Sequence, residues 1–276
     1  MSAHSPQTLP PWRTRLSRSG SRLVPAPLPE WAYFLDLDGT LIEIAAVPSG
    51  VHADGSVQLL IAQMVARTGG ALAIITGRPI REIDALFPGL VLPVAGQHGV
   101  ERRSASGEIV QHAVVTSSLD EARSVLTRIV GRHPVLLLED KGMSLALHYR
   151  QAPRLGGYAH RTMSQVRRAL GDAYCVQAGK FVVELKPAGR DKGSAITDFM
   201  AEWPFSGRMP VFIGDDLTDE YGFDVVNAMG GLSVKVGRGR TRAQWQMQDV
   251  NAVRGWLSQS SGRRMVEAIP SLTRPS

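Results

Sequence analysis

The chain has 276 residues, 43% of them hydrophobic, and a formal net charge of +6 at pH 7. This length is sufficient to bury a sizeable core, in one domain with an insertion or in two domains. Residues 1–29 contain four Arg and no acidic residue, and residues 258–276 contain three Arg and one Glu. The segment between them has 24 basic and 24 acidic residues, so it offers no excess charge for a nucleic-acid backbone and excludes that class of partner.

The two terminal segments have the composition of tails. Residues 1–29 are rich in Pro, Ser and Arg and lack an apolar run, which predicts a disordered basic tail, with an organelle transit peptide as the alternative. Residues 258–276 are predicted to form a flexible C-terminal tail. No stretch approaches the roughly 18 apolar residues that span a bilayer, so no membrane association is expected. Cys175 is the single cysteine and cannot form an internal disulfide, which favours a reducing, cytoplasmic setting.

Short apolar runs alternate with segments of helical periodicity, the pattern of a parallel sheet with crossover helices. The expected core strands are Trp31–Leu35, Ala71–Ile75, Leu90–Ala95 and Val211–Ile213. A helix is expected from Asp54, as its N-cap, to Arg67, because Gly69-Gly70 follows as a stop signal. The fold class predicted is α/β, with a doubly wound, mostly parallel sheet.

The pattern changes in the middle of the chain. Residues 100–112 are expected to form a hairpin that turns at Ser106-Gly107. From about residue 116 to 186 the order becomes helix, two strands, helix, two strands; the four strands are expected at Val135–Leu138, Met143–Tyr149, Tyr174–Gln177 and Phe181–Leu185, and the second helix at Gly157–Leu170. This order predicts a small α+β domain, 116–186, inserted between two core segments, 30–115 and 187–257.

Paired carboxylates follow two of the expected core strands. Asp36 and Asp38 come directly after the first strand, and Asp215 with Asp216 follows the strand Val211–Ile213. Asp36 and Asp38 point the same way because side chains alternate along an extended segment. Gly39 lets the backbone bend there, so that amide N–H groups can face an anion. Clustered carboxylates are costly unless a cation compensates them, so one shared site for a metal and a phosphate is predicted.

This arrangement suits phosphoryl transfer. One carboxylate can attack phosphorus to give an aspartyl phosphate, while the other acts as general acid and then as general base for water. Magnesium would reduce the charge repulsion between carboxylates and phosphate, and Asp215 is the natural third protein ligand. The alternative is that Asp38-Gly39-Thr40 is only a turn. The second acidic cluster, Asp215 with Asp216, favours a site for a metal and a phosphate over a simple turn.

Four motifs resemble those of the haloacid-dehalogenase-like phosphatases and occur in the order found in that family. They are Asp36-Leu37-Asp38-Gly39-Thr40-Leu41, Thr76-Gly77-Arg78, Lys192 in Asp191-Lys192-Gly193, and Gly214-Asp215-Asp216-Leu217-Thr218-Asp219-Glu220. Three further segments resemble the trehalose-6-phosphate phosphatase family: Gly96-Gln97-His98-Gly99-Val100-Glu101, Glu184-Leu185-Lys186-Pro187, and the extension Thr218-Asp219-Glu220. The resemblance covers about residues 30–257 and identifies the insertion as a cap.

The resemblance implies roles for individual residues. Asp36 would be the nucleophile and a magnesium ligand, and Asp38 the acid/base that binds the metal through its backbone carbonyl. Thr76 would hydrogen-bond the transferring phosphoryl group, and Lys192 would balance its charge and orient Asp36. Asp215 would hold magnesium. Asp216 and Asp219 would lie close by, behind the direct ligands.

Simpler structural roles compete with some of these assignments. Thr76 could cap the helix that follows Pro79, and Lys192 could be a solvated charge at a helix start. A lysine is unusual there because the helix dipole prefers anions, and an anion-binding role explains it. Lys180 and Arg103 could simply be solvated surface and are left out of the candidate set.

A cap confers specificity by enclosing the substrate and excluding water. The candidates for contact with the sugar lie on the cap and on the facing loops of the core. His98 could instead be a structural loop residue. The full set is Arg78, His98, Glu101, Lys141, Gly142, Met143, Glu184 and Lys186.

The predicted function is magnesium-dependent hydrolysis of trehalose 6-phosphate, the last step of trehalose biosynthesis. One alternative is a capped phosphatase for sucrose phosphate or another sugar phosphate, which would use the same core residues. Another is a catalytically inactive sugar-phosphate sensor, which would have little use for both a nucleophile and its acid. Besides the sugar-phosphate substrate, functional coupling to a trehalose-6-phosphate synthase is expected.

Overall fold

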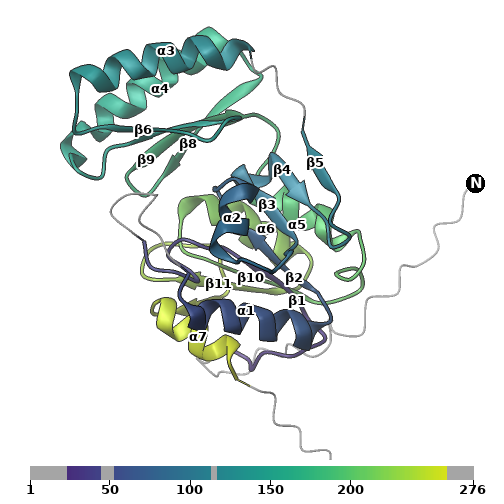
Figure 1. Cartoon of the computed structure of the whole chain (residues 1–276). Helices are drawn as coiled ribbons and strands as arrows, with labels where there is room; N and C mark the ends of the chain where they lie inside the picture. Colours follow the sequence, from purple (N-terminus) through teal and green to yellow (C-terminus); the bar gives the residue numbers. More distant parts are fainter. Residues whose placement is uncertain (1–23, 45–52, 113–116, 260–276) are drawn as a thin grey trace, which may run out of the picture.

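The computed structural model describes residues 24–44, 53–112 and 117–259. Two sheets dominate the described residues, an eight-stranded sheet in the core and a four-stranded sheet in a smaller unit that lies over it (Figure 1). The eight-stranded sheet has the order β12-β11-β10-β1-β2-β3-β4-β5. Its first six strands pair in parallel, and β4 and β5 add an antiparallel hairpin at one edge. The predicted fold class is therefore confirmed.

The core strands are short and mostly buried. Their bounds are Ala32–Leu35 (β1), Leu72–Ile75 (β2), Val94–Gly96 (β3), Glu101–Arg103 (β4), Ile109–Gln111 (β5), Pro210–Gly214 (β10), Leu232–Val236 (β11) and Trp245–Met247 (β12). Side chains alternate between the two faces of the sheet. On β1, Tyr33 and Leu35 enter one apolar cluster and Ala32 and Phe34 enter the other. Both faces of the sheet are thus covered, as a doubly wound fold requires.

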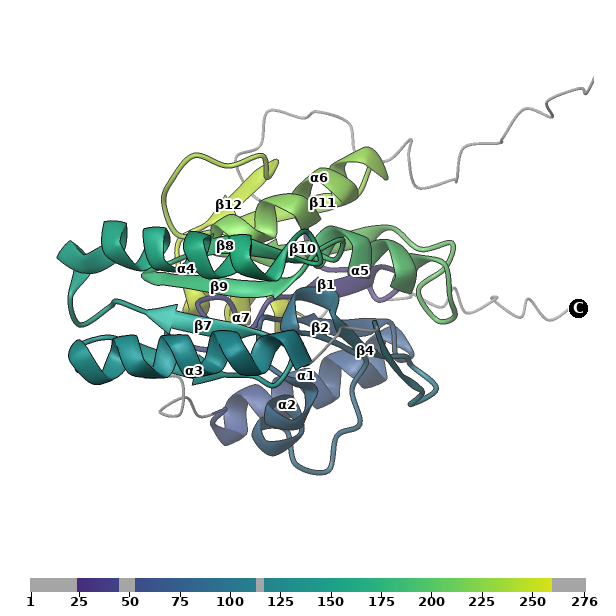
Figure 2. The same ribbon diagram turned by 90° about the horizontal axis from the view of Figure 1, so that it is seen from above.

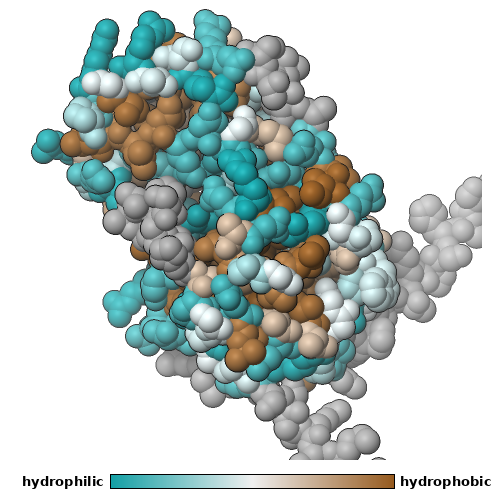
Figure 3. Space-filling view, in the orientation of Figure 1, coloured by the Kyte–Doolittle hydropathy of each residue, from teal (hydrophilic) through white to brown (hydrophobic). Residues whose placement is uncertain are grey.

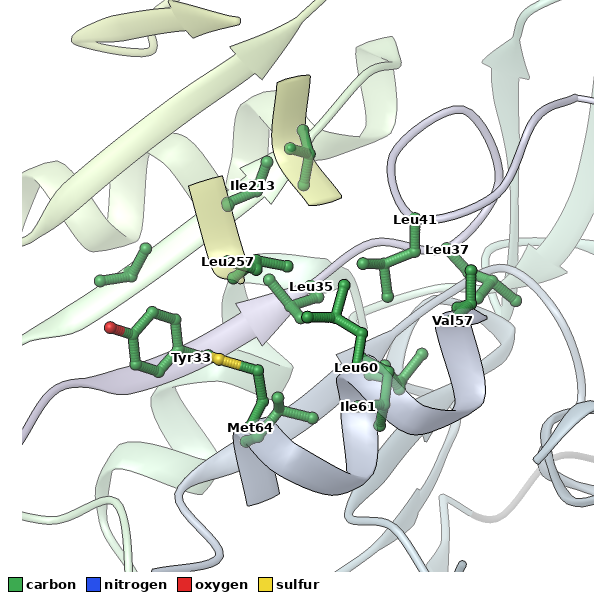
Figure 4. Close-up of a cluster of buried hydrophobic side chains, with 14 of the residues drawn as sticks. Tyr33, Leu35, Leu37, Leu41, Val57, Leu60, Ile61, Met64, Ile213 and Leu257 are labelled. Atoms are coloured by element: carbon green, nitrogen blue, oxygen red, sulfur yellow. The ribbon is translucent and has the colours of Figure 1, made fainter. Parts of the chain in front are cut away.

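Helices α1 (Gly55–Thr68), α2 (Ile80–Leu86) and α7 (Val250–Leu257) contribute to the first cluster. Asp54 caps α1 as predicted, since its side chain accepts hydrogen bonds from the N–H groups of Ser56 and Val57. Gly69 ends the helix with a positive φ of 62°. Figure 4 shows the apolar face of α1, with Leu60, Ile61 and Met64, packed beneath the side chains of β1.

The opposite face of the core sheet is covered by α5 (Lys192–Met200) and α6 (Glu220–Ala228), which pack against each other. Phe34 of β1 and Phe212 of β10 contact the apolar side chains of these helices, and Phe34 lies 6.0 Å from Phe199 of α5, measured between ring centroids. Asp191 and Ser194 form a capping box at the start of α5. The first turn of α5 is thereby fixed at the carboxyl edge of the sheet.

The smaller unit contains β6 (Leu137–Asp140), β7 (Leu145–His148), β8 (Tyr174–Gly179) and β9 (Val182–Pro187) in the antiparallel order β6-β7-β9-β8. Helices α3 (Ser117–Arg132) and α4 (Gly156–Leu170) lie side by side on its outer face (Figures 1 and 2). Alternate residues of the strands, such as Leu147 and Val183, pack against these helices. The other face of this sheet is turned toward the core.

Three short 3₁₀ helices complete the described elements: Gln97–Gly99, Pro153–Leu155 and Leu217–Asp219. The hairpin predicted over residues 100–112 is confirmed by the pairing of β4 with β5. The expected start of the inserted domain, residue 116, lies outside the described residues, as do most residues of the two predicted tails.

Three strand predictions were wrong in their bounds. The strand expected at Leu90–Ala95 is limited to Val94–Gly96, since Pro93 has no N–H for a ladder and residues 90–93 follow a turn at Pro88-Gly89. The strand expected at Val135–Leu138 begins two residues later, because the N–H of Leu136 closes a turn on His133. Met143 lies in the bend between β6 and β7, outside the strand expected for it.

Candidate active site

Acidic side chains from two neighbouring strands meet at the carboxyl edge of the core sheet. β1 and β10 are parallel with Leu35 opposite Ile213, so the residues that follow them, Asp36 and Asp215, emerge at the same edge. The N–H of Asp36 donates to the carbonyl of Ile213 at 3.0 Å. Gly39 has a φ of 83°, and a Cβ there would lie 2.3 Å from Oδ2 of Asp215. Only glycine therefore allows the first loop to approach the second this closely.

Lys192, the first residue of α5, points into this acidic cluster. Its Nζ donates to Oδ1 of Asp36 at 2.7 Å and to Oδ1 of Asp219 at 2.6 Å. All three side chains are buried, with exposed fractions of 3%, 6% and 0%. The other carboxylate oxygen of Asp219 accepts the N–H of Asp216 at 2.8 Å. Lys192 is thus a buried partner of two carboxylates, and its interpretation as a solvated charge is wrong.

One cation, Lys192, is bonded to two carboxylates of this cluster. Burial and the neighbouring charge of Asp219 raise the pKa of Asp36 well above its usual value, although Lys192 opposes this shift. Burial, together with the charges of Asp219 and Asp216, raises the pKa of Asp215 to about 6. Burial is the main cause of both shifts and the neighbouring carboxylates add to them, so a bound cation would favour the ionised forms.

The donor set fits a hard divalent cation. Oxygen atoms of Asp36, Asp215 and Asp219 all lie within 4.8 Å of one another. Carboxylate oxygens are the ligands that Mg²⁺ takes in proteins. Asp219 was expected behind the direct ligands, yet its side chain lies in the same cluster. Both oxygens of Asp219 accept hydrogen bonds, from Lys192 and from the N–H of Asp216, so Asp36 and Asp215 are the candidate direct ligands in this cluster.

Asp38 lies apart from this cluster and is paired with Arg78. The guanidinium donates from Nε to Oδ2 at 2.7 Å and from the second nitrogen to Oδ1 at 2.8 Å, a two-point contact. Arg78 also donates to Glu82 at 2.9 Å. Although burial opposes it, the bond to Asp38 raises the pKa of Arg78. A residue predicted to contact the sugar therefore contacts the predicted acid/base.

Thr76 follows β2 and is buried at the same edge of the sheet. Its hydroxyl oxygen accepts the N–H of Arg78 at 3.1 Å. Helix α2 begins at Ile80 after Pro79, with no side-chain cap. The alternative that Thr76 caps this helix is therefore wrong, and its side chain lines the cleft described next.

A cleft of about 170 Å³ separates the two sheets at this point. Residues of the core form its floor and residues of the cap sheet form its roof. The lining comprises Asp36, Asp38, Ile44, Thr76, Gly77, Arg78, His98, Glu139, Lys141, His148, Arg150, Lys180, Val182, Glu184, Lys192, Asp215, Asp216 and Thr218. The predicted catalytic and metal residues thus share one cavity with residues of the inserted unit.

A buried polar network joins the cap to the core beside this cleft. Glu184 accepts hydrogen bonds from Lys141 at 3.0 Å and Ser144 at 2.7 Å, and it lies 3.2 Å from Nε2 of His98. Lys141 also donates to the carbonyl of Gly77 in the core at 2.9 Å. In Figure 3, hydrophilic residues lie on part of the visible surface where the two parts meet. The contact between cap and core is therefore largely polar beside the cleft.

The charges in this network stabilise one another. Although burial opposes it, Lys141 and His98 hold the pKa of Glu184 well below its usual value. Glu184 in turn raises the pKa of Lys141 against the effect of burial. Burial lowers the pKa of His98, whose ring packs so closely on Gly77 that a Cβ there would lie 2.7 Å from Nε2.

Four of the predicted substrate residues do not line the cleft. Glu101 is buried and accepts the N–H of Ile80 at 2.8 Å, so it fixes the loop before α2. Lys186 is buried and donates to the carbonyl of Arg190. Gly142 and Met143 lie in the bend between β6 and β7. Contact of these residues with a substrate stays a prediction.

Several cleft residues were missed in the sequence. Glu139, His148 and Val182 lie on the core-facing side of the cap sheet and could have been found from the alternation with Leu138, Leu147 and Val183. Thr218 also lines the cleft and belongs to the fourth motif, although no contact was assigned to it. Arg150 lines the cleft without a sequence signal that separates it from other polar loop residues.

A solvated surface position is wrong for Arg103 but agrees with the exposure of Lys180, which was missed as a cleft residue. Lys180 is exposed but lines the cleft. Arg103 is buried and donates to Asp84 at 2.6 Å, so it is a structural ion pair.

The sequence model of the trehalose-phosphatase family matches residues 34–253, most of the chain. The chain belongs to this family. It is 44% identical to the trehalose-6-phosphate phosphatase of Escherichia coli over 229 residues, which are 83% of this chain and 85% of that protein. The predicted resemblance is therefore confirmed.

Solved structures agree with the fold of this trehalose-phosphatase family member. A crystal structure of a trehalose-6-phosphate phosphatase related protein matches with a TM-score of 0.70 and 28% identity, over 82% of this chain and 94% of that one. A haloacid dehalogenase-like hydrolase from Bacteroides thetaiotaomicron matches with a TM-score of 0.56 and 16% identity, over 82% and 97% of the two chains. The latter similarity concerns the fold alone. Among the described residues, no helix is long and apolar enough to cross a membrane.

Proposed function

We propose that this protein hydrolyses trehalose 6-phosphate to trehalose and phosphate, with magnesium and through an aspartyl-phosphate intermediate. The observation that carries the proposal is the buried pair of Lys192 and Asp36, at 2.7 Å, in a cleft shared with the cap. Membership of the trehalose-phosphatase family supports the choice of substrate. The E. coli relative supports it through its name as well as its sequence.

Asp36 is the proposed nucleophile. A carboxylate oxygen attacks phosphorus, and the bond between phosphorus and the sugar oxygen breaks. Lys192 holds Oδ1 of Asp36, which directs the attack to Oδ2 and keeps a positive charge beside the phosphoryl oxygens. Thr76, buried at the floor of the cleft, donates its hydroxyl hydrogen to a phosphoryl oxygen. These three residues come from different strands and helices, yet they share one edge of the core sheet.

Asp38 is the proposed acid/base. To act as the acid it must first carry a proton, which requires one of its oxygens to leave Arg78. It gives this proton to the leaving sugar oxygen and then takes a proton from the water that attacks the aspartyl phosphate, so that its protonation state is restored. Two nitrogens of the Arg78 guanidinium donate to the two oxygens of this carboxylate, at 2.7 and 2.8 Å. Arg78 therefore determines where this carboxylate points, in addition to any contact with the sugar.

Asp36 and Asp215, with the backbone carbonyl of Asp38, would hold the magnesium ion, and Asp219 and Asp216 would support the site. When bound, the ion supplies positive charge that lowers the repulsion between the carboxylates and the phosphate. The raised pKa values of Asp36 and Asp215 support this assignment, because a cation would compensate their charge.

The inserted unit, 116–186, is proposed as the cap that selects the sugar. Glu139, Lys141, Lys180 and Glu184 on the cap, with His98 on the core, offer charged hydrogen-bonding groups to hydroxyls of the sugar that does not react. Glu184 and Lys141 already bond to each other and to the core, so a bound sugar exchanges some of these bonds for its own hydroxyls. Coupling to a trehalose-6-phosphate synthase and a cytoplasmic location stay predictions.

A phosphate-release assay over several sugar phosphates tests the proposal. Purified protein with magnesium is expected to release phosphate faster from trehalose 6-phosphate than from sucrose, glucose or maltose phosphates. Asp36→Asn is the inactive control, because it keeps the shape of the site but lacks the nucleophile. Faster release from sucrose phosphate would show that sucrose phosphate, rather than trehalose 6-phosphate, is the preferred substrate. No release from any of them would favour the alternative of an inactive sugar-phosphate sensor.

A further inference from the structure

Glu139 and His148 form a hydrogen-bonded pair on the face of the cap sheet that lines the cleft. Nε2 of His148 lies 2.7 Å from Oε2 of Glu139. β6 and β7 pair with Leu137 opposite His148 and with Glu139 opposite Ala146. Glu139 and His148 are therefore diagonal neighbours on one face, within reach of long side chains. Their positions follow from the register of the two strands.

Most of the surface of both side chains is covered. The exposed fractions of the two side chains are 20% for His148 and 18% for Glu139. Although burial opposes it, the hydrogen bond from His148 and the charge of Lys141 lower the pKa of Glu139. An ionised carboxylate can only accept, so Nε2 of His148 carries the hydrogen of this bond. One oxygen of Glu139 is thereby engaged, and the other stays available to accept a hydroxyl.

A glutamate on a strand has several rotamers, and ordering it during binding costs free energy. A partner that fixes the carboxylate beforehand reduces this cost and sets the direction in which it accepts. On β9, Glu184 is fixed in this way by Lys141 and Ser144. His148 is the corresponding partner for Glu139 on the neighbouring part of the same sheet.

We infer that His148 is a positioning residue that determines the specificity for the sugar. It holds Glu139 in the orientation that accepts a hydroxyl of the non-reacting sugar, and it does not take part in phosphoryl transfer. This inference rests on the proposed function, since it concerns the same cleft. If the pair had a purely structural role, a substitution of His148 would instead reduce activity on all substrates and lower the stability of the cap.

The test compares His148→Phe, His148→Gln and His133→Gln on two substrates. Phe keeps the ring without a donor, whereas the amide nitrogen of Gln can donate from about the position of Nε2. His133 also belongs to the cap, but it packs edge-on against Tyr158, at 4.9 Å between centroids, and does not line the cleft. The substrates are trehalose 6-phosphate and p-nitrophenyl phosphate, which has no second sugar.

His148→Phe is expected to raise KM for trehalose 6-phosphate about tenfold, the effect of one charged hydrogen bond, with kcat changed less than twofold. Its kinetics on p-nitrophenyl phosphate should match the wild type. His148→Gln and His133→Gln should stay within about twofold of the wild type on both substrates. Adding His148→Phe to Glu139→Gln should cause no further loss, because both changes remove the same interaction.

Two results would overturn the inference: unchanged KM in His148→Phe, or an equal loss on both substrates together with a lower melting temperature. Failure of the proposed function gives a different result. If the wild type prefers another sugar phosphate, the same variants are compared on that substrate and the criteria stay the same. A wild type that hydrolyses p-nitrophenyl phosphate but no sugar phosphate would overturn both.

Discussion

Nζ of Lys192 lies 2.7 Å from Oδ1 of Asp36, a residue 156 positions earlier in the chain. The pair joins the end of β1 to the first turn of α5, and the inserted cap lies between the two in sequence. The same ammonium group binds Asp219 at 2.6 Å, so one cation holds together three segments of the core. The site therefore depends on the tertiary fold, and its electrostatics can be tested one residue at a time.

Replacement of Lys192 by Met should destabilise the protein and stop turnover. It leaves Asp36 and Asp219 buried without their cation, and breaking a buried ion pair costs about 3–5 kcal/mol of unfolding free energy. Loss of the charge beside the phosphoryl group should lower kcat by about a hundredfold or more. Urea unfolding and phosphate release measure the two effects. Arg240→Gln is the control, since Arg240 is exposed and should change neither quantity.

Asp36→Asn should abolish turnover and leave the fold intact. The amide has nearly the shape of the carboxylate but cannot attack phosphorus. The melting temperature is expected within a few degrees of the wild type, because the change also removes a buried negative charge whose raised pKa marks it as unfavourable. Phosphate release near the wild-type rate would exclude the covalent mechanism.

Asp38→Asn should lose more activity on a sugar phosphate than on p-nitrophenyl phosphate. An alkoxide leaving group requires a proton, whereas nitrophenolate leaves without one. A loss of about a hundredfold on the sugar phosphate and a much smaller loss of aspartyl-phosphate formation on the aryl phosphate are expected. Burst kinetics on the aryl phosphate measure that first step separately. Equal losses in both would assign the proton transfer to another residue.

The catalytic residues of the core could be predicted from the sequence because they directly follow buried strands. The parallel order of β1, β2 and β10 brings Asp36, Thr76 and Asp215 to one edge, as the spacing of apolar runs predicted. The cleft residues of the cap could be predicted only in part. Their positions depend on the register of the antiparallel cap strands, which decides which of the two alternating sets of side chains faces the cleft.

Long-range side-chain pairs were the least predictable part of the site. Arg78 was expected at the sugar, but its bond to Asp38 requires the exact approach of two loops 40 positions apart. Likewise, the burial of Arg103 follows from its pairing with Asp84 on α2, which no local pattern indicates. Charge alone does not separate such buried pairs from a solvated surface.

Magnesium should stabilise the folded protein by binding the clustered carboxylates of the active site. A ligand that binds only the folded state raises the melting temperature as its concentration exceeds Kd. Thermal unfolding with magnesium and with a chelator should differ by several degrees, and Asp215→Asn should abolish the difference. Asp224→Asn is the control, because Asp224 pairs with Arg242 on the surface and should keep the full effect. An equal magnesium effect in Asp215→Asn would place the ion elsewhere.

The network between cap and core should weaken in acid in two steps. The pKa of His98 lies below its usual 6.5, so its contribution to stability is complete above pH 6.5 and is lost as the pH falls. The pKa of Glu184 lies well below 4.5, so its contribution is present above pH 4.5 and is lost below it. The buried Nδ1 of His98 has no partner among the described residues, so a proton added there finds no acceptor.

Urea unfolding at pH 7.5, 5.5 and 4 separates these steps. His98→Gln should reduce the loss of stability between pH 7.5 and 5.5, because Gln does not titrate. Glu184→Gln should lower stability at pH 7.5 by about 3 kcal/mol, since it leaves Lys141 without its counter-charge, and should reduce the loss toward pH 4. His133→Gln removes a histidine outside the network and should keep the wild-type pH dependence. A parallel pH dependence in His98→Gln and the wild type would show that His98 does not control this step.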